Sequence, residues 1–290
     1  MAEADRSQYG EQIPEVAREP RAAASEVTFP NAAWPGSSPE LQLRQAAFPS
    51  WTFWDVLSIL GATAAAIFLC SSAGLALAHR LPAYRHQSLA ALAQTPLIIV
   101  GSQLASYPIV IAFMAAIIRR RSGESFLHGI RWSWPMGKTL RFCLFGIALA
   151  FCVEGLAHFL PIPKSLPMDK FFNDAGSAYL MAFFGVAVAP LLEELFFRGM
   201  LYPILRRGLG ITTALALTAA AFAAIHGAQL GYAWAPILSI FVVGLVLTLV
   251  REYTDSVAAC FLTHSGYNFA LFTLLWFGTD HFRHLEKLNV

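Results

Sequence analysis

Three ionisable residues stand close together inside a long apolar stretch of the chain. They are Glu193, Glu194 and Arg198, and the apolar stretch runs from about 178 to 205. Placing one charged side chain in the hydrocarbon of a membrane costs about 2.5–3.5 kcal/mol even on lenient insertion scales. A chain keeps such groups where they pair with one another or carry out chemistry. This segment is therefore the first candidate for a functional site.

Helical spacing divides these three residues into two kinds. Glu194 and Arg198 are four residues apart with the acid first, which is the favourable order for an ion pair on one helix face. Glu193 lies about 100° around the helix from Glu194 and therefore faces elsewhere. The sequence predicts a structural ion pair between Glu194 and Arg198, and a separate carboxylate, Glu193, directed at other polar groups.

Two later apolar stretches supply those polar groups. His226 ends the sequence Phe-Ala-Ala-Ile-His, and His264 and Asn268 are four residues apart, so that both project from one helix face. A carboxylate or imidazole can take a proton from water, and neutral His and Asn side chains can donate to an oxyanion, which together suit hydrolysis of an amide bond. We predict that Glu193, His226, His264 and Asn268 are catalytic, with Glu193 as the general base.

The same side chains are also ordinary zinc ligands. Glu193, His226 and His264 would hold the ion if a metal were bound. The residue types leave a glutamate-activated water and a metal-activated water both open. For either histidine alone, a hydrogen bond in helix packing is an equally good interpretation. The prediction therefore depends on the three segments meeting in the fold.

Other kinds of catalytic site find no support in the sequence. The HExxH motif is absent, nothing like GxSxG surrounds Ser265, and no paired membrane aspartates occur. Signatures for nucleotides or nucleic acid are missing, and the four cysteines form no CxxC pair.

Glu154 and His158 are interpreted as a local pair or as cavity lining. Charges near span ends are interpreted as interfacial: Asp55, Arg251, Glu252 and Asp255.

The composition is that of a polytopic membrane protein. Of 290 residues, 57% are hydrophobic and 13% are charged, with a mean hydropathy of +0.55, whereas soluble domains carry roughly 25% charged residues. Seven stretches approach the ~20 apolar residues that a spanning helix needs, at 54–78, 95–118, 140–160, 178–205, 212–230, 235–250 and 257–277. The predicted fold class is an all-α polytopic membrane protein with about seven transmembrane helices.

Two features of this helix assignment remain open. An eighth helix could lie in the amphipathic loop 126–134, although we favour an interfacial element there. Pro190 and Pro203 could kink the fourth stretch or mark its end.

Three parts make up the predicted domain organisation. A polar, proline-rich and mobile tail at 1–50 precedes a transmembrane helical domain at 51–280, whose catalytic core lies at 178–277, and a short tail follows at 281–290. Basic residues concentrate in the loops after the second and fourth stretches: Arg119, Arg120, Arg121, Arg131, Lys138, Arg206 and Arg207. The positive-inside rule places these loops, and the N-terminus, in the cytoplasm.

At the candidate catalytic residues, the sequence resembles a known family. Residues 193–198 (Glu-Glu-Leu-Phe-Phe-Arg) are similar to the EExxxR motif of the CAAX-protease and bacteriocin-processing (CPBP, or Abi) family of intramembrane endopeptidases. Residues 222–226 are similar to its FxxxH motif, and residues 264–268 to its HxxxN motif. The motifs occur in the family's order. The resemblance covers about 178–277, and the earlier stretches carry none of it.

The resemblance implies an all-helical membrane fold whose active site opens from the cytoplasmic side. In the family's prenyl-protein peptidases, the residues matching Glu193 and His226 activate water, and those matching His264 and Asn268 support the oxyanion. The resemblance ranks a metal-free, glutamate-type mechanism first and Zn²⁺ second. Eukaryotic members remove the last three residues of prenylated CAAX proteins. Bacterial members are linked to peptide maturation, bacteriocin self-immunity or processing of sorted surface proteins.

The sequence therefore predicts an intramembrane endopeptidase that hydrolyses a membrane-associated protein or peptide with a glutamate-activated water. The partners would be membrane lipids and a membrane-tethered protein or peptide substrate, without nucleic acid, and the location the cell (inner) membrane. Two alternatives belong to other classes: a non-proteolytic immunity or scaffold protein of the same fold, and a proton-coupled transporter that uses the buried acids and imidazoles as a relay. The lack of inverted repeats argues modestly against transport.

Overall fold

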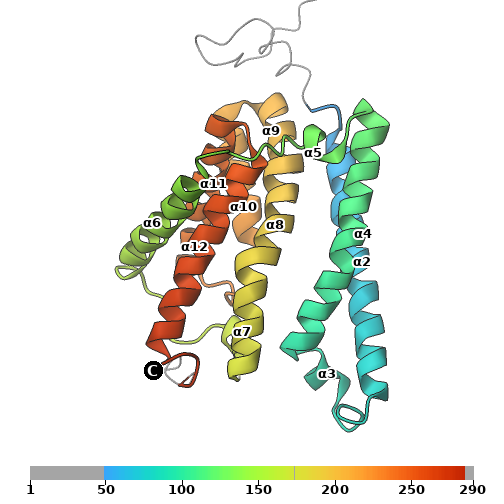
Figure 1. Cartoon of the computed structure of the whole chain (residues 1–290), viewed down its shortest axis with the longest axis vertical. Coiled ribbons are helices and arrows are strands. Elements are labelled where there is room, and N and C mark those ends of the chain that lie inside the picture. The colour runs from blue at the N-terminus through green and yellow to red at the C-terminus, as the bar shows by residue number, and fades with distance from the viewer. Residues whose placement is uncertain (1–48, 173, 285–290) are drawn as a thin grey trace, which may run out of the picture.

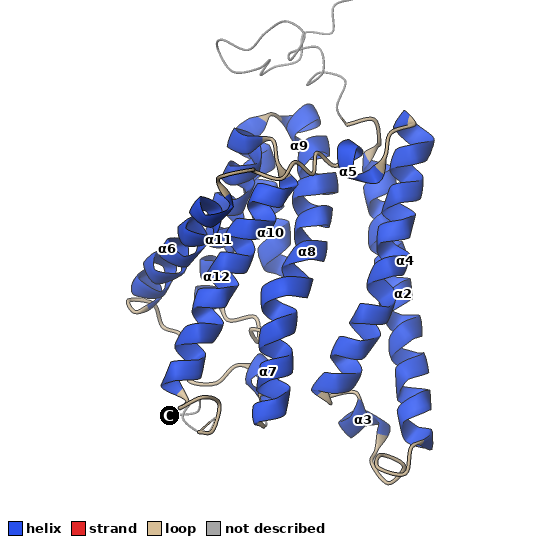
Figure 2. Cartoon of the chain, in the orientation of Figure 1, coloured by secondary structure: helices blue, strands red, loops and turns tan. Residues whose placement is uncertain are grey.

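The computed structural model describes residues 49–172 and 174–284, and in this part of the chain helices joined by loops and turns are the only regular structure, without strands (Figures 1 and 2). The predicted all-α fold class is confirmed. Most of the predicted N-terminal tail at 1–50 and the end of the predicted tail at 281–290 lie outside the described residues.

Each predicted apolar stretch corresponds to a helix. Among the described residues, five helices are long and apolar enough to cross a membrane: α2 (Phe53–Arg80), α4 (Pro96–Ser122), α6 (Thr139–Ala157), the helix Ala175–Leu209, and α11 (Trp234–Thr254). Two further helices complete the set. The apolar α10 (Ile211–Ile225) is shorter, and α12 (Val257–Gly278) carries the polar residues His264 and Asn268. The chain is a multi-pass membrane protein, and the helices of its described part are roughly compatible with the predicted seven.

Some boundaries differ from those predicted. The third helix ends at Ala157, and the fifth ends at Ile225 because a succession of turns through Gly227 and Gly231 follows it. The loop 126–134 forms only the one-turn helix α5 (Phe126–Gly129) and turns, so it supplies no eighth spanning helix. The remaining short helices lie in connections: α3 (Leu89–Leu92) and η1 (Pro167–Phe171).

The fourth spanning helix contains two π-helical turns. It consists of α7 (Ala175–Phe183), the π turn η2 (Phe184–Val188), α8 (Ala189–Glu194), the π turn η3 (Leu195–Leu201) and α9 (Tyr202–Leu209). Each π turn directly precedes an α-helical segment with a proline, Pro190 or Pro203, in its first turn. Proline lacks an amide hydrogen and clashes with the preceding turn, and a wider turn relieves that clash. The helix therefore continues through both prolines to Leu209.

The helices form two groups around this central helix. The hairpin of α2 and α4 lies on one side, and α6, α10, α11 and α12 lie on the other (Figure 1). The most extensive packing joins α6 to α12. A Cβ atom added to Gly146 would lie 2.0 Å from the Thr263 carbonyl oxygen, and one added to Gly266 would lie 2.3 Å from that of Cys143. Glycine thus lets the two backbones touch, as is common between membrane helices.

The basic residues gather at one end of the molecule. The C-terminal ends of α4 and α9, which carry Arg119, Arg206 and Arg207 among others, lie near the start of α2 and near α5, at the top of Figure 1. The end of α12 lies at the opposite end of the molecule. We call the first of these the basic end. The positive-inside rule predicts that it faces the cytoplasm.

Candidate active site

The predicted site residues lie on three helices. Glu193 and Glu194 end α8, Arg198 lies in η3, His226 directly follows α10, and His264 and Asn268 lie on α12. The side chains of Glu194 and Arg198 are fully buried, whereas 22% of the Glu193 side chain and 17% of the His226 side chain are exposed. Glu193 is therefore the carboxylate that another molecule can reach.

Arg198 binds the partner that its spacing predicts. Its Nη1 donates to Glu194 Oε1 at 2.8 Å. Its other nitrogens bind α11, with Nη2 donating to the Gly244 carbonyl at 2.9 Å and Nε donating to Thr248 Oγ1 at 3.3 Å. A buried charge is tolerated where its hydrogen-bonding groups have such partners. The ion pair thus fixes the central helix to α11.

Glu194 has a second partner that spacing does not predict. His264 Nδ1 donates to the same oxygen, Oε1, at 2.8 Å. Because the same Oε1 already accepts from Arg198, Nδ1 is the donor in this hydrogen bond and carries the proton. The contact turns His264 Nε2 toward Glu193 Oε2, at 3.8 Å. In the neutral imidazole this Nε2 is an acceptor.

His226 is oriented in the same way by the backbone. Its Nδ1 lies 2.8 Å from the Phe222 carbonyl oxygen, one helical turn earlier. Since a carbonyl oxygen can only accept, Nδ1 carries the proton and Nε2 is again the acceptor in the neutral ring. This Nε2 lies 4.0 Å from Glu193 Oε1. The structure thus places Glu193 between two imidazole Nε2 atoms, one facing each carboxylate oxygen.

Asn268 lies one turn after His264 and makes a backbone contact. Its Nδ2 donates to the Gly185 carbonyl at 2.7 Å, within η2. In the described part of the chain, no hydrogen bond joins Asn268 to Glu193, His226 or His264. The contact ties α12 to the central helix and uses one of the two amide hydrogens. Its role as an oxyanion donor stays a prediction.

Phe222 occupies the centre of the site, although sequence reasoning gave it no role beyond the first position of a motif. Its ring centroid lies 4.9 Å from that of His226 and 5.6 Å from that of His264. Arg198 Cζ lies 4.7 Å from the same centroid, within the range of a cation–π interaction. The side chain is buried. The sequence signal that could have identified Phe222 as part of the site is the FxxxH spacing, which puts it one helical turn from His226.

The alternative predicted from the sequence is a Zn²⁺ ion held by Glu193, His226 and His264. Within residues 49–172 and 174–284, no group of three or more His, Cys, Asp or Glu side chains is arranged to hold one. The Glu193 carboxylate oxygens lie 4.0 Å from His226 Nε2 and 3.8 Å from His264 Nε2. Zn²⁺ therefore stays the alternative to be tested.

Glu154 and His158 lie apart from the site. Both side chains are exposed on or directly after α6, and no ion pair joins them in the described part of the chain. The His158 ring contacts Phe159 edge to face. Neither residue contacts the group around Glu193.

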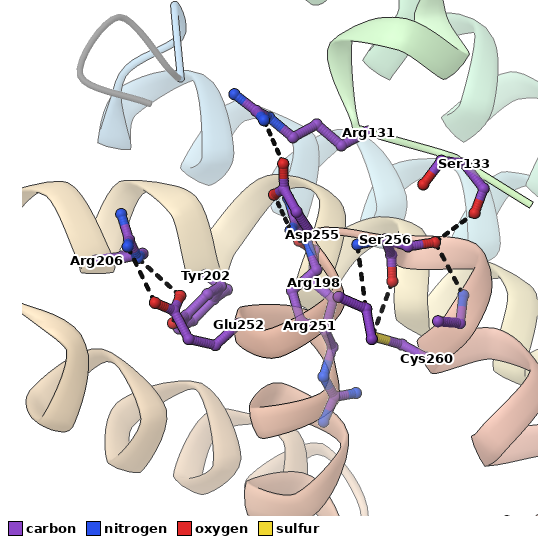
Figure 3. A network of polar contacts seen from close by, with 12 residues as sticks. Arg131, Ser133, Arg198, Tyr202, Arg206, Arg251, Glu252, Asp255, Ser256 and Cys260 are labelled. Atoms are coloured by element: carbon purple, nitrogen blue, oxygen red, sulfur yellow. Dashed lines mark hydrogen bonds and ion pairs between the residues drawn. The ribbon is translucent and has the colours of Figure 1, made fainter. Parts of the chain in front are cut away.

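A polar network at the basic end holds the helices that carry the site (Figure 3). Glu252 on α11 accepts from Arg206 Nε at 2.8 Å and from the Tyr202 hydroxyl at 2.7 Å, both on α9. Arg251 Nε donates to the Arg198 carbonyl at 3.1 Å, and Asp255 pairs with Arg251 and Arg131. From the sequence, Arg251, Glu252 and Asp255 were interpreted as interfacial charges. The structure shows that they also connect α9, α11 and the loop after α5.

The comparison with protein families agrees with the motifs. Residues 175–270 match the family model described as type II CAAX prenyl endopeptidase Rce1-like. The matched segment runs from α7 into α12 and contains all three motifs. No curated protein and no solved structure matches the chain significantly. The predicted resemblance to the CAAX-protease family is confirmed, over this segment.

Proposed function

We propose that this chain, whose residues 175–270 belong with the type II CAAX prenyl endopeptidases, is an intramembrane endopeptidase in which Glu193 activates the hydrolytic water. The observation that carries the proposal is the position of Glu193 between two imidazoles, with Nε2 of His226 at 4.0 Å and Nε2 of His264 at 3.8 Å. Each gap is too long for a direct hydrogen bond and suits a bridging water.

The gap between Glu193 and His226 is where the attacking water would bind. Both facing atoms, Glu193 Oε1 and His226 Nε2, are acceptors when the ring is neutral, because Nδ1 donates to Phe222. A water between them would donate one hydrogen to each and direct its lone pairs outward. Glu193 would take one proton as the water oxygen bonds to the scissile carbonyl carbon. His226 is in this scheme an orienting acceptor.

His264 needs an additional proton to support the oxyanion. Its Nδ1 proton is used by Glu194, so its Nε2 can donate only when the ring is an imidazolium. Two carboxylates flank that ring, with Glu194 Oε1 2.8 Å from Nδ1 and Glu193 Oε2 3.8 Å from Nε2. The Nε2–H group and the second Asn268 amide hydrogen are the donors for the developing oxyanion.

Collapse of the tetrahedral intermediate completes the reaction. The carbonyl double bond re-forms, the carbon–nitrogen bond breaks, and the proton held by Glu193 passes to the leaving nitrogen. The products are a carboxyl group and an amine, so no oxidant or further reactant is needed.

The position of the site restricts the substrate. Glu193 lies near the middle of a 35-residue helix, in a hydrocarbon layer that is about 30 Å thick. A scissile bond that reaches it would belong to a membrane-tethered protein or peptide. We assign the protein to the cell membrane with the basic end, and therefore the N-terminal side of α2, in the cytoplasm.

Cleavage of a membrane-tethered peptide by the purified full chain tests this function. Glu193→Gln should abolish cleavage because glutamine cannot accept the water proton, while expression and helix content stay as in the wild type. Glu154→Gln, which alters an exposed carboxyl group outside the site, is the matched control and should cleave normally. Full cleavage by Glu193→Gln would refute the mechanism. Rescue of a deletion strain by that inactive variant would instead favour a scaffold.

A further inference from the structure

An open groove of about 530 Å³ lies between α6 and α11, outside the candidate active site. Its volume falls within the roughly 300–1,000 Å³ of ligand-binding sites. Further from the basic end, the same two helices share a buried cluster through Leu149 and Val243. The groove is formed where the beginning of α6 faces the end of α11.

The walls of the groove are apolar in the part that lies away from the basic end. They consist of Phe142, Phe145, Val246, Leu249 and Val250. Phe142 also packs on a buried cluster that contains Val250 and, from α12, Ala259 and Cys260. The groove therefore lies beside the part of α12 that precedes His264 by one turn.

Three residues with polar groups stand at the basic end of the groove. Arg141, Tyr253 and Thr254 line it there, almost entirely with the carbon atoms of their side chains, and no acidic side chain does. Arg141 is exposed, and no hydrogen bond or ion pair joins its guanidinium to another residue within 49–172 or 174–284. From Arg141 to Phe145, and from Tyr253 to Val246, the lining extends about 6–10 Å along the helices. The groove thus combines one unbalanced cation with an apolar channel directed into the membrane.

We propose that this groove binds one acidic phospholipid, with its phosphate beside Arg141 and an acyl chain along the apolar walls. Both walls belong to membrane-spanning helices, so lipid is the solvent at this surface. A basic side chain at the membrane surface attracts anionic headgroups. The charge of Arg141 therefore selects an acidic lipid over a zwitterionic one.

Binding can be measured by native mass spectrometry of the full chain in detergent. The probes are phosphatidylglycerol, phosphatidylcholine with the same acyl chains, and inorganic phosphate. The wild type should bind phosphatidylglycerol more tightly than phosphatidylcholine. Arg141→Gln should weaken phosphatidylglycerol binding about fivefold, the effect of one basic residue near a membrane surface. Arg120→Gln is the matched control, because Arg120 is exposed at the basic end of α4 and does not line the groove.

A second variant tests the acyl-chain channel. Leu249→Trp should fill the groove from its α11 wall and lower the binding of both lipids, whereas inorganic phosphate should bind to none of the variants. Equal affinities for the two lipids, or undiminished phosphatidylglycerol binding by Arg141→Gln, would overturn the proposal. If Leu249→Trp fails to fold, the comparison of Arg141→Gln with Arg120→Gln still decides it. The readout does not depend on proteolysis, so the groove and the proposed function fail separately.

Discussion

His264 Nδ1 donates a hydrogen bond of 2.8 Å to Glu194 Oε1, the same oxygen that binds Arg198. One buried carboxylate therefore holds both a structural cation and a candidate catalytic imidazole. The two adjacent glutamates therefore have different roles. Glu194 orients the site from within the protein, and Glu193 faces the space in which a water and a substrate would meet.

Removing the charge of Glu194 should destabilise the protein, because Arg198 would then be a buried cation without its counter-ion. Breaking such a pair costs about 3–5 kcal/mol. Glu194→Gln should therefore lower the free energy of unfolding by about that amount, measured by denaturant unfolding in detergent. Glu193→Gln, at a partly exposed site, is the control and should change it little.

A double variant separates the two tasks of Glu194. Glu194→Gln combined with Arg198→Met removes both buried charges and should recover much of the lost stability. Cleavage should stay impaired, because His264 no longer has a carboxylate to orient it. Normal cleavage by the stable double variant would show that Glu194 acts only through Arg198.

Phe222 should position both imidazoles by its ring contacts. Phe222→Leu removes the contacts with His226 and His264, and displacement of catalytic groups by about 1 Å can cost on the order of a hundredfold in rate. We expect kcat to fall by about ten- to a hundredfold with a smaller change in KM. Phe197→Leu is the control, since Phe197 contacts Phe222 and neither histidine. Equal losses in the two variants would contradict a positioning role.

The close approach of α6 and α12 should set the position of His264. Gly266→Ala would place a methyl group 2.3 Å from the Cys143 carbonyl, so α12 must shift away from α6. We expect a loss of stability of about 1–3 kcal/mol from overpacking, together with reduced cleavage. Gly155→Ala, with open space around the added methyl, should leave cleavage intact and slightly stabilise α6. Wild-type thermal stability of Gly266→Ala would argue against rigid packing here.

Chelation distinguishes the two mechanisms of water activation. The imidazoles and Glu193 are spaced for bridging water, so we expect cleavage to persist after treatment with a chelator and dialysis. Metal analysis should then find much less than one zinc ion per chain. A stoichiometric zinc ion whose removal abolishes cleavage, with recovery on adding zinc, would establish the alternative.

The sequence by itself determined the features that depend on local spacing and composition. The apolar stretches predict the helices, because about 20 apolar residues suffice to cross the hydrocarbon layer. The four-residue spacing of Glu194 and Arg198 predicts their contact, because such residues are neighbours on one helix face. The three motifs predicted the match of residues 175–270 to the CAAX prenyl endopeptidase family model. Each of these inferences concerns residues within one segment or the order of segments.

Only the tertiary structure decided which side chains from different helices meet. The second partner of Glu194, the contact of Asn268 with Gly185 and the central position of Phe222 all join separate segments. These contacts depend on how closely α12 approaches α6 and on the π turns that rotate the central helix around Pro190 and Pro203. A π turn changes the direction in which every later side chain of the helix projects, and a few tenths of an ångström at a glycine contact shift a whole helix. The spacing of residues along the chain predicts neither the direction of side chains after a π turn nor the distance between two packed helices.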